Sequence, residues 1–579
     1  MPSRTGAVHV ATTKRVYKGK TYVTHLLRRS IRKGKTVTHE TLGNLSHLPD
    51  HVIDLVKRSL KGETFVPAAN AVRITRSLPH GHVEAVLKMI KTLGLDDLIA
   101  SDPSRRRNLV VAMIAERLIF PSSKLANTRH WHDTTLAEEL DVADATEDQL
   151  YDAMDWLLER QSAIENKLAR RHLSDGAMVL YDVTSSYYEG KTCPLARLGH
   201  DRDGKTGLPI IVYGALTDAD GRPVAVQVYP GNTADPKTVP DQVEMLTKRF
   251  GLSRVVLVGD RGMLTQTQID VLKKHPGLGW ISALRSGSIR RLLADGHLVK
   301  KDLQAERLAE INSPDFPDER LVACYNPLLA EQRRQKRHDL LAATQAELET
   351  LSASVAKSAT AGRPETAAEI GVRAGKIINH YKMSKHFTLT IGDGSLKWAR
   401  KQDEITREEL LDGIYVVRTS EPTERLTAAD GVRSYKRLAL VEQAFRCLKG
   451  IDLMVRPIHH RTAERVRAHI LLCLLAFYVE WHLRQVWEPL LFEDEGLTED
   501  RPRRDPVAPA KPSESARLKK KTHKTAGGLP VQSFRTLMAH LGTRCRNACV
   551  MTADPNQIRF DQLTEADALQ AEALRLIKM

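Results

Sequence analysis

The chain has 579 residues, of which 42% are hydrophobic and 27% charged, so its composition is that of a globular protein and disorder is not the default; its length suggests two to four domains. Its six cysteines are far apart except for the last pair, which excludes a disulfide framework and indicates a reducing cytoplasm. The longest apolar run, 470–479, suits a buried helix and is too short to span a bilayer, so we expect no membrane association.

The formal net charge of +16 is concentrated in two segments. Residues 1–40 hold ten Lys or Arg against one acid, Glu40, and residues 501–525 hold nine against two. Clustered positive charge favours a polyanion such as nucleic acid, although a solubilising tail explains 501–525 equally well. The β-branched residues and Gly-Lys turns of residues 1–75 predict a basic N-terminal β-hairpin unit.

The next two regions differ in periodicity. Residues 76–173 have helical apolar spacing and predict a helical, possibly DNA-binding, domain. Residues 174–296 predict the first part of a mixed α/β core, with a strand at 176–188, a hairpin at 208–231 turning at Asp220-Gly221, and a second buried strand in 254–263.

The α/β pattern is then interrupted. Residues 297–420 predict an insertion domain with short strands around a charged helix, which suits either a solvated arm or a coiled hairpin. Residues 421–495 return to amphipathic helix and predict the end of the core. Residues 496–579 predict a basic linker and a C-terminal helical segment.

Two aspartates occupy equivalent places in this pattern. Asp182 follows the apolar run 178–181, and Asp260 follows the apolar run 255–258. An isolated Asp at a strand end is often only a turn-forming residue. Two such residues on strands of one sheet, however, place carboxylates on one edge, where α/β sheets hold ligands. A pair of Mg²⁺ ions needs hard oxygen ligands and a bridging carboxylate, so a third acid is expected.

The third acid is Glu442, in a helix predicted over 434–450. Tyr435 and Lys449 lie seven residues to either side of it, two turns away on the same helical face. An apolar stripe runs beside that face: Leu438, Val441, Phe445 and Leu448. An ordinary surface helix, in which Glu442 pairs with Arg446, is the alternative.

With "YDVTS" and "GDRGM", this spacing resembles DDE transposases of bacterial insertion sequences, in particular insertion-sequence family four, the "YREK" group. The signature of that group is Tyr, two residues, Arg, three residues, Glu, six residues, Lys. Tyr435, Glu442 and Lys449 match it in register, whereas Leu438 occupies the Arg position and Arg437 lies one place early. The resemblance extends from the basic N-terminal region to about residue 485.

The resemblance implies a ribonuclease H-like fold with a β-rich insertion before the glutamate helix, where 297–420 falls. It implies catalytic carboxylates at Asp182, Asp260 and Glu442, with Asp182 bridging two Mg²⁺ ions, for which Mn²⁺ can substitute. Tyr435 and Lys449 would contact DNA phosphates. Arg446 lies four residues after Glu442, about 40° to one side of it, and we predict that it replaces the missing Arg.

The implied activity is cutting and rejoining of DNA at the ends of an insertion sequence. Its partners would be double-stranded transposon ends and target DNA, bound by a homodimer in the bacterial cytoplasm at the nucleoid. Two alternatives stay open on the residues alone: a catalytically inactive, transposase-derived repressor, and a structure-specific nuclease on the same fold. Short inverted repeats flanking the coding DNA would favour the transposase.

Overall fold

The computed structural model describes residues 4–63, 65, 71–551 and 558–578. The chain forms two compact units. Unit 1 consists of Met1–Leu78 with Arg544–Glu565, and unit 2 of Pro79–Thr543 with Ala566–Met579. Unit 1 therefore combines segments from near both ends of the sequence.

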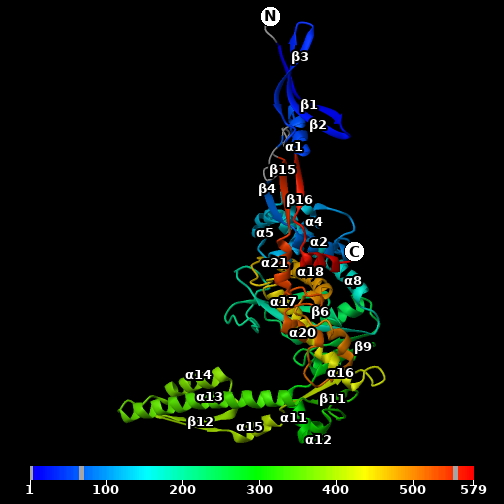
Figure 1. Cartoon of the computed structure of the whole chain (residues 1–579). Coiled ribbons are helices and arrows are strands. Elements are labelled where there is room, and N and C mark those ends of the chain that lie inside the picture. The colour runs from blue at the N-terminus through cyan, green and yellow to red at the C-terminus, as the bar shows by residue number, and fades with distance from the viewer. Residues whose placement is uncertain (1–3, 64, 66–70, 552–557, 579) are drawn as a thin grey trace. The chain divides into compact units, whose positions relative to one another are not determined.

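Unit 1 is built mainly from antiparallel strands (Figure 1). The strands β1 (Arg4–Tyr17), β2 (Lys20–Lys33) and β3 (Thr36–Asn44) form one antiparallel sheet within the segment 1–75. Lys18 and Gly19 both have positive φ at the first turn, as a type I′ hairpin requires. After α1 (Asp50–Leu60), a second sheet has the order β16 (Arg559–Leu563), β15 (Cys545–Met551), β4 (Val72–Pro79).

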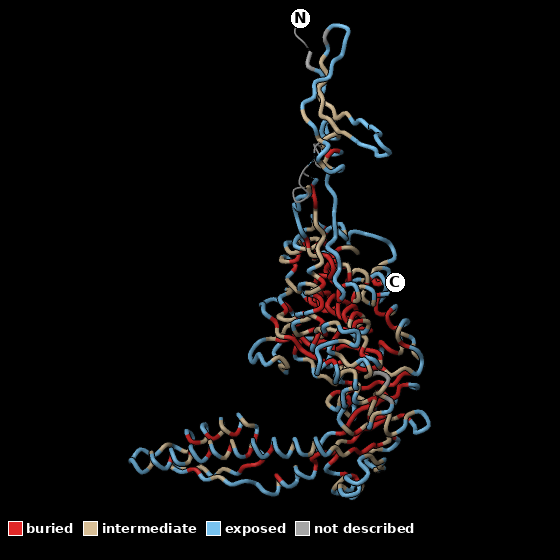
Figure 2. The backbone as a smooth tube through the Cα atoms, viewed as in Figure 1, coloured by how far each residue is buried: buried red, intermediate tan, exposed pale blue. Residues whose placement is uncertain are grey.

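The strands of the first sheet bury few side chains. Figure 2 shows β1 to β3 as exposed or half-buried along their described length. Ile53 of α1 is one of the few buried apolar residues of unit 1. A two-sided exposed sheet with basic side chains has its charge available to a partner.

The first part of unit 2 is helical from Gly81 to His172. Its helices are α2 (Gly81–Thr92), α3 (Leu95–Ile99), α4 (Arg105–Ile119), α5 (Lys124–His130), α6 (Leu136–Glu139), α7 (Glu147–Glu159) and α8 (Gln161–His172). Of these, α2, α4 and α7 pack against α18 (Ala463–Trp487), which lies almost wholly in the core. The helix α18 is long and apolar enough to cross a membrane, but 83% of its most apolar window is buried within the described chain.

A mixed sheet forms the centre of unit 2, with the strand order β10-β11-β14-β9-β8-β5-β6-β7. Its strands are β5 (Ala177–Tyr187), β6 (Ile210–Asp218), β7 (Pro223–Pro230), β8 (Val255–Val258), β9 (Leu278–Ala283), β10 (Leu308–Ile311), β11 (Arg320–Tyr325) and β14 (Ile414–Thr419). The strand β5 is antiparallel to β6 and parallel to β8, and β8 is parallel to β9. This arrangement confirms the predicted mixed α/β core.

The β6–β7 hairpin turns where the sequence predicts. Gly221 has a φ of +82°, and its amide donates to the Asp218 carbonyl oxygen at 3.1 Å. Gly214 on β6 is needed for a different reason, because a Cβ there would lie 2.3 Å from the Tyr181 hydroxyl oxygen. The phenol of the buried Tyr181 therefore fills the space over Gly214, next to Asp182 in sequence.

Short helices connect these strands. They are α9 (Val239–Glu244), α10 (Gln266–Leu272), α11 (Ser286–Ala294) and α12 (Lys300–Glu306). The short 3-10 helices are η2 (Trp131–Asp133), η3 (Asp235–Thr238), η5 (Ser384–His386), η6 (Glu488–Leu490) and η7 (Arg501–Arg503). The segment η4 (Met245–Arg249) is a short π-helix.

The insertion has a hydrophobic core of its own. The long helix α13 (Pro327–Thr360) packs against α14 (Ala367–Tyr381), and the β-hairpin of β12 (Phe387–Gly392) and β13 (Ser395–Arg400) lies along them (Figure 1). Leu348, Val355 and Ile370 are fully buried there. The charged helix is therefore half of a helical hairpin. The helix α15 (Gln402–Glu409) follows, and β14 returns the chain to the central sheet.

The remaining helices complete unit 2. They are α16 (Ala428–Lys436), α17 (Leu438–Lys449), α19 (Leu497–Asp500), α20 (Glu514–Thr522), α21 (Phe534–Gly542) and α22 (Ala568–Leu576). The helix α17 packs on β5 and α18, and its buried residues join one continuous core with the sheet and the helical layer. This packing positions Glu442 next to the strand that carries Asp182.

Candidate active site

The strand register brings Asp182 next to Asp260. Leu180 is paired with Val258 in the parallel β5–β8 ladder, an offset of 78 residues, and the same offset relates Asp182 to Asp260. We predicted that Asp182 ends its strand, and this was wrong. The antiparallel pairing with β6 continues to Tyr187 after β8 has ended, so Asp182 lies inside β5 but beyond its last β8 partner. The edge of β5 facing Asp260 is thus open at the acid.

The negative charges of both other acids act on the carboxyl group of Asp182. The pKa of the partly buried Asp182 is raised to about 7, first by burial and then by the negative charges of Asp260 and Glu442. A hydrogen bond from the Val183 amide to Oδ1, at 2.8 Å, and the positive charge of Arg202 act in the opposite direction. Burial is therefore the main reason that the charged form of Asp182 is disfavoured, and the charges of Asp260 and Glu442 add to it.

Asp260 is held by the turn that follows β8. Its Oδ1 accepts from the amides of Gly262, at 3.0 Å, and Met263, at 2.7 Å. Arg285 donates to the carbonyl oxygens of Arg261 and Gly262 and so braces the same turn. With both turn amides on Oδ1, Oδ2 makes no hydrogen bond to any described residue and is available to a ligand.

Glu442 lies on the exposed side of α17. The predicted stripe beside it is confirmed, since Leu438, Val441, Phe445 and Leu448 are all buried. Within the described chain its carboxylate forms no hydrogen bond or ion pair, and the alternative pair with Arg446 does not form. Arg446 is likewise exposed and without a partner among the described residues.

The predicted single helix over 434–450 was wrong, because the chain turns at Arg437. Tyr435 ends up on α16 and Glu442 on α17. The Arg437 guanidinium donates to the Ala219 carbonyl oxygen at 3.3 Å and lies 3.9 Å from Asp220, so it is fixed against the β6–β7 turn.

Tyr435 nevertheless faces the acids. The pKa of its phenol is raised to about 12, first by burial and then by the negative charge of Asp260. Glu442 and Asp182 act in the same direction, and the positive charge of Arg261 opposes them. Tyr435 and Arg261 also line one cavity of about 640 Å³ that reaches the base of the insertion.

Lys449 is engaged inside the protein. Its ammonium donates to the Thr184 hydroxyl at 3.0 Å, the Ser185 carbonyl oxygen at 3.0 Å and Asp203 Oδ1 at 2.7 Å. These contacts use all three donors of an ammonium group. Arg456 binds the same Asp203 oxygen at 2.5 Å. Lys449 therefore anchors α17 to β5 close to Asp182.

Sequence reasoning missed two residues of the 200–204 loop. Asp203, with a side chain only 1% exposed, neutralises Lys449 and Arg456. Arg202 is the cation that lowers the pKa of Asp182, and both oxygens of Asp235 hold its guanidinium, at 2.5 and 2.7 Å. A polar Asp-Arg-Asp loop carries no periodicity, so only the fold identifies these partners.

The donor set fits a divalent metal. Three carboxylates, one of them partly buried, are hard oxygen ligands, and none of them forms an ion pair within the described chain. Ligand oxygens around a pair of ions about 4 Å apart need not all lie close to one another. Consistent with that, the only described set whose ligand atoms all lie within 4.8 Å is another one: Cys447, Asp452 and Glu480.

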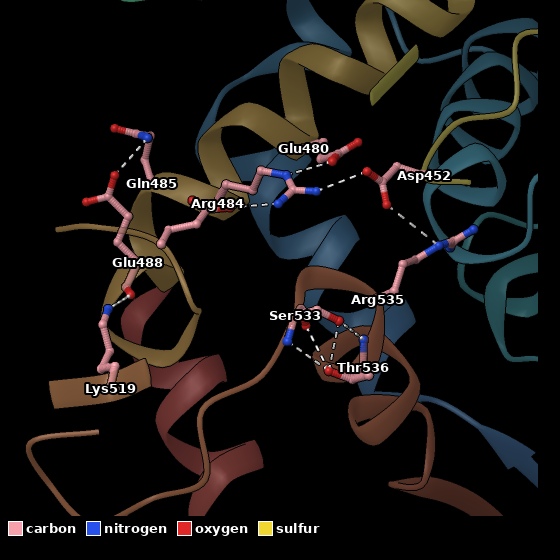
Figure 3. Close-up of polar contacts among 10 residues, drawn as sticks. Asp452, Glu480, Arg484, Gln485, Glu488, Lys519, Ser533, Arg535 and Thr536 are labelled. Atoms are coloured by element: carbon pink, nitrogen blue, oxygen red, sulfur yellow. Dashed lines mark hydrogen bonds and ion pairs between the residues drawn. The ribbon is translucent and has the colours of Figure 1, made fainter. Parts of the chain in front are cut away.

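This second set is already neutralised. Arg484 donates to Glu480 at 2.7 Å and to Asp452 at 3.1 Å, and Arg535 lies 3.9 Å from Asp452 (Figure 3). Burial raises the pKa of the Cys447 thiol, which disfavours the thiolate that a metal needs. We therefore interpret the cluster as a structural ion-pair network between α18 and α21.

Two acids on neighbouring strands of a mixed sheet, with a third acid on the adjacent helix, are a donor set of the kind that metal-dependent phosphoryl-transfer enzymes use. The chain belongs to the transposase DDE domain family, whose model matches residues 179–479, and the IS1634 family transposase N-terminal domain matches residues 10–68. The resemblance to an insertion-sequence DDE transposase is thus confirmed, and the protein is a metal-dependent enzyme that cuts and joins DNA. Membership of insertion-sequence family four stays a prediction.

Among solved structures, one similar chain is that in the cryo-EM structure of the piggyBac transposase synaptic complex with hairpin DNA. The two chains are 12% identical, with 79% of this chain and 77% of that chain covered and a TM-score of 0.30. At this TM-score the likeness defines neither the fold nor the site. No curated protein matches the sequence.

Proposed function

We propose that the protein cuts and rejoins the DNA ends of an insertion sequence, with Asp182, Asp260 and Glu442 as its catalytic, metal-holding carboxylates. The observation that carries this proposal is the β5–β8 register, supported by the raised pKa of Asp182, to which burial and then the charges of Asp260 and Glu442 contribute. Two Mg²⁺ ions, or Mn²⁺ in their place, would supply activation of a water or DNA 3′-hydroxyl and stabilisation of the leaving oxygen.

Each acid has a distinct place in this proposal. Asp182 interacts with both other acids and is the candidate to bridge the metals. Asp260 has one oxygen fixed by the turn amides and presents the other. Glu442 is exposed and unpaired within the described chain, so no internal bond has to break before it binds a metal.

The phosphate contacts are proposed for Tyr435, Arg446 and Lys449. Arg446 has an exposed guanidinium one helical turn after Glu442. The phenol of Tyr435 lies close enough to Asp260, Glu442 and Asp182 for their charges to raise its pKa. A guanidinium can bind a phosphate with two parallel hydrogen bonds. Lys449 contributes charge at the same place, and a direct contact with DNA would require its ammonium to exchange one of its three acceptors.

The finer fold assignment and the partners belong to the same proposal. The order β7-β6-β5-β8-β9, with an antiparallel meander next to parallel strands and an insertion before α17, supports the ribonuclease H-like fold. We infer that the exposed basic sheet of unit 1 binds transposon-end DNA. The enzyme would act on these ends and on target DNA as a homodimer, in the cytoplasm at the nucleoid.

A cleavage assay on the flanking DNA tests the proposal. Asp182→Asn, Asp260→Asn and Glu442→Gln should each abolish Mg²⁺-dependent cleavage while DNA affinity stays within about threefold, because metal ligation and phosphate contact are separate. Asp270→Asn, an exposed acid on α10, is the matched control and should cleave normally. Binding without cleavage by the wild type would favour the repressor, and cleavage without joining the nuclease.

A further inference from the structure

A basic cavity of about 580 Å³ lies between the helical layer and the segment 454–469 of unit 2. Five cationic side chains line it, against one carboxylate, that of Glu147. The cationic residues are Arg117, Lys124, Arg456, Arg461 and Arg465. None of the three catalytic acids borders the cavity, so it is a separate site.

Two of these cations are buried without a counter-ion. Lys124 is 3% exposed, and its ammonium has no hydrogen-bond partner in the described chain. Arg117 is 6% exposed and donates only to the carbonyl oxygens of Leu453, at 3.4 Å, and Ser122, at 3.3 Å. A buried cation without an anion is strongly unfavourable unless something else neutralises it.

The nearest acid does not supply that charge. Glu116 on α4 is 1% exposed, neither of its carboxyl oxygens has a hydrogen-bond partner in the described chain, and burial raises its pKa to about 8. Burial, followed by the positive charge of Arg117, lowers the pKa of Lys124 to about 7. An anion entering the cavity would favour the charged form of Lys124, because an opposite charge nearby raises the pKa of an ammonium group.

The remaining lining residues suit an anion with several oxygen atoms. The cavity includes Thr462, the N-cap of α18, where the positive end of a 25-residue helix favours negative charge. Burial lowers the pKa of His460 to about 3, so its ring is neutral and can donate one hydrogen bond without adding charge. Arg461 is exposed and its side chain has no partner among the described residues.

We propose that the basic cavity binds a phosphate group, held by Lys124, Arg117 and Arg461 beside the N-terminus of α18. We assign that phosphate to the backbone of the bound DNA, an assignment that rests on the proposed function, whereas phosphate binding itself does not. A free phosphate compound has the same chemistry and is distinguished by the test below.

The cavity is connected to the active site through Arg456. Arg456 lines the cavity and binds Asp203, and Asp203 binds Lys449, which is bonded to Thr184 on β5. Thr184 lies two residues after Asp182. A phosphate that competes for Arg456 therefore acts on the same contacts that fix α17 against the catalytic strand.

Inorganic phosphate is the first probe, titrated into the full-length protein at constant ionic strength with chloride as the reference salt. It should bind saturably and raise the thermal midpoint. Lys124→Met should weaken it at least about tenfold, because hydrogen bonds to charged groups contribute that much. Lys91→Met, at an exposed lysine of α2, is the matched control and should bind as the wild type does.

Arg461→Gln provides a second variant that cannot disturb the core, since Arg461 is exposed. It should weaken phosphate binding about threefold or more, and it decides the question if Lys124→Met fails to fold. Phosphate effects no larger than those of chloride, or unchanged phosphate affinity in both variants, would overturn the proposal.

The salt dependence of DNA binding then identifies the source of the phosphate. Loss of a DNA phosphate contact should lower the log–log salt slope by about 0.9 in Lys124→Met and not in Lys91→Met. Lost phosphate binding with an unchanged DNA slope would overturn the assignment to DNA and identify a free phosphate compound. Because phosphate binding is measured without DNA, failure of the cleavage assay leaves this result interpretable.

Discussion

Lys449 can have one of two roles that different measurements distinguish: it anchors α17 to β5, or it binds a DNA phosphate. Its ammonium donates hydrogen bonds to Asp203, Thr184 and Ser185, and the side chain of Asp203 is 1% exposed. If anchoring is the main role, Lys449→Met and Asp203→Asn should both reduce the stability of unit 2. Their effects should also depend on each other, because they remove the same ion pair.

The contacts of Lys449 and Asp203 determine how much unfolding free energy each variant should lose. Lys449→Met leaves Asp203 with Arg456 as a counter-ion, so we expect a loss of about 1.5–3 kcal/mol, the range for a hydrogen bond to a charged group. Asp203→Asn leaves two cations without their acid, so we expect about 3–5 kcal/mol. The double mutant should lose about 1.5–3 kcal/mol less than the sum of the single effects.

Denaturant unfolding followed by tryptophan fluorescence measures these losses. All six tryptophans of the sequence lie within Pro79–Thr543, so the signal reports on unit 2. Glu464→Gln, at an exposed acid on α18, is the control and should change stability by less than about 0.5 kcal/mol. A coupling near zero, together with a DNA salt slope lowered by about 0.9 in Lys449→Met, would refute the anchoring role.

Four further predictions concern separate parts of the chain. Deleting residues 1–40 should lower the log–log salt slope of DNA binding by several units, and an unchanged slope would make the segment a solubilising tail. Arg446→Gln should slow cleavage at least tenfold, about 1.4 kcal/mol, whereas the same loss in Arg437→Gln would place the missing signature arginine there. Gly214→Ala should destabilise unit 2 by about 1–3 kcal/mol, since the added Cβ would lie 2.3 Å from the Tyr181 hydroxyl oxygen. An unfolding midpoint of this variant equal to that of the wild type would contradict that packing. Burial raises the pKa of Glu480 to about 7, so the folded state binds more protons than the unfolded state between pH 4.5 and 7. The free energy of unfolding should therefore fall as the pH rises through this range, and it should fall less in Glu480→Gln. Equal pH profiles for the two proteins would contradict this.

The parts of the site that the sequence predicted depend on local patterns. Apolar runs before Asp182 and Asp260 identified two neighbouring strands, and the β5–β8 register places the two acids at equivalent positions, with Asp182 inside β5. The stripe beside Glu442 identified the buried face of α17, since helical periodicity is a local property. Both inferences needed only a few adjacent residues.

The parts that the sequence did not predict depend on distant contacts. The break at Arg437 is accompanied by its hydrogen bond to Ala219, which lies 218 residues away in the chain. Asp203 and Lys449 are separated by 246 residues, and the buried Lys124 is unusual only once α4, α5 and the 454–469 segment have packed. No propensity or spacing contains this information, because it comes from tertiary packing.

The central claim is that Asp182, Asp260 and Glu442 hold a divalent metal together, and the position of the metal can be measured directly. Fe²⁺ replacing Mg²⁺, with ascorbate and peroxide, cuts the polypeptide close to the bound ion, and the fragments can be mapped by mass spectrometry. We predict cuts near residues 182, 260 and 442, suppressed by excess Mg²⁺ and absent in Asp182→Asn. Cuts near Asp452 and Glu480 instead, unaffected by Asp182→Asn, would contradict the claim and place the metal at the other ligand set.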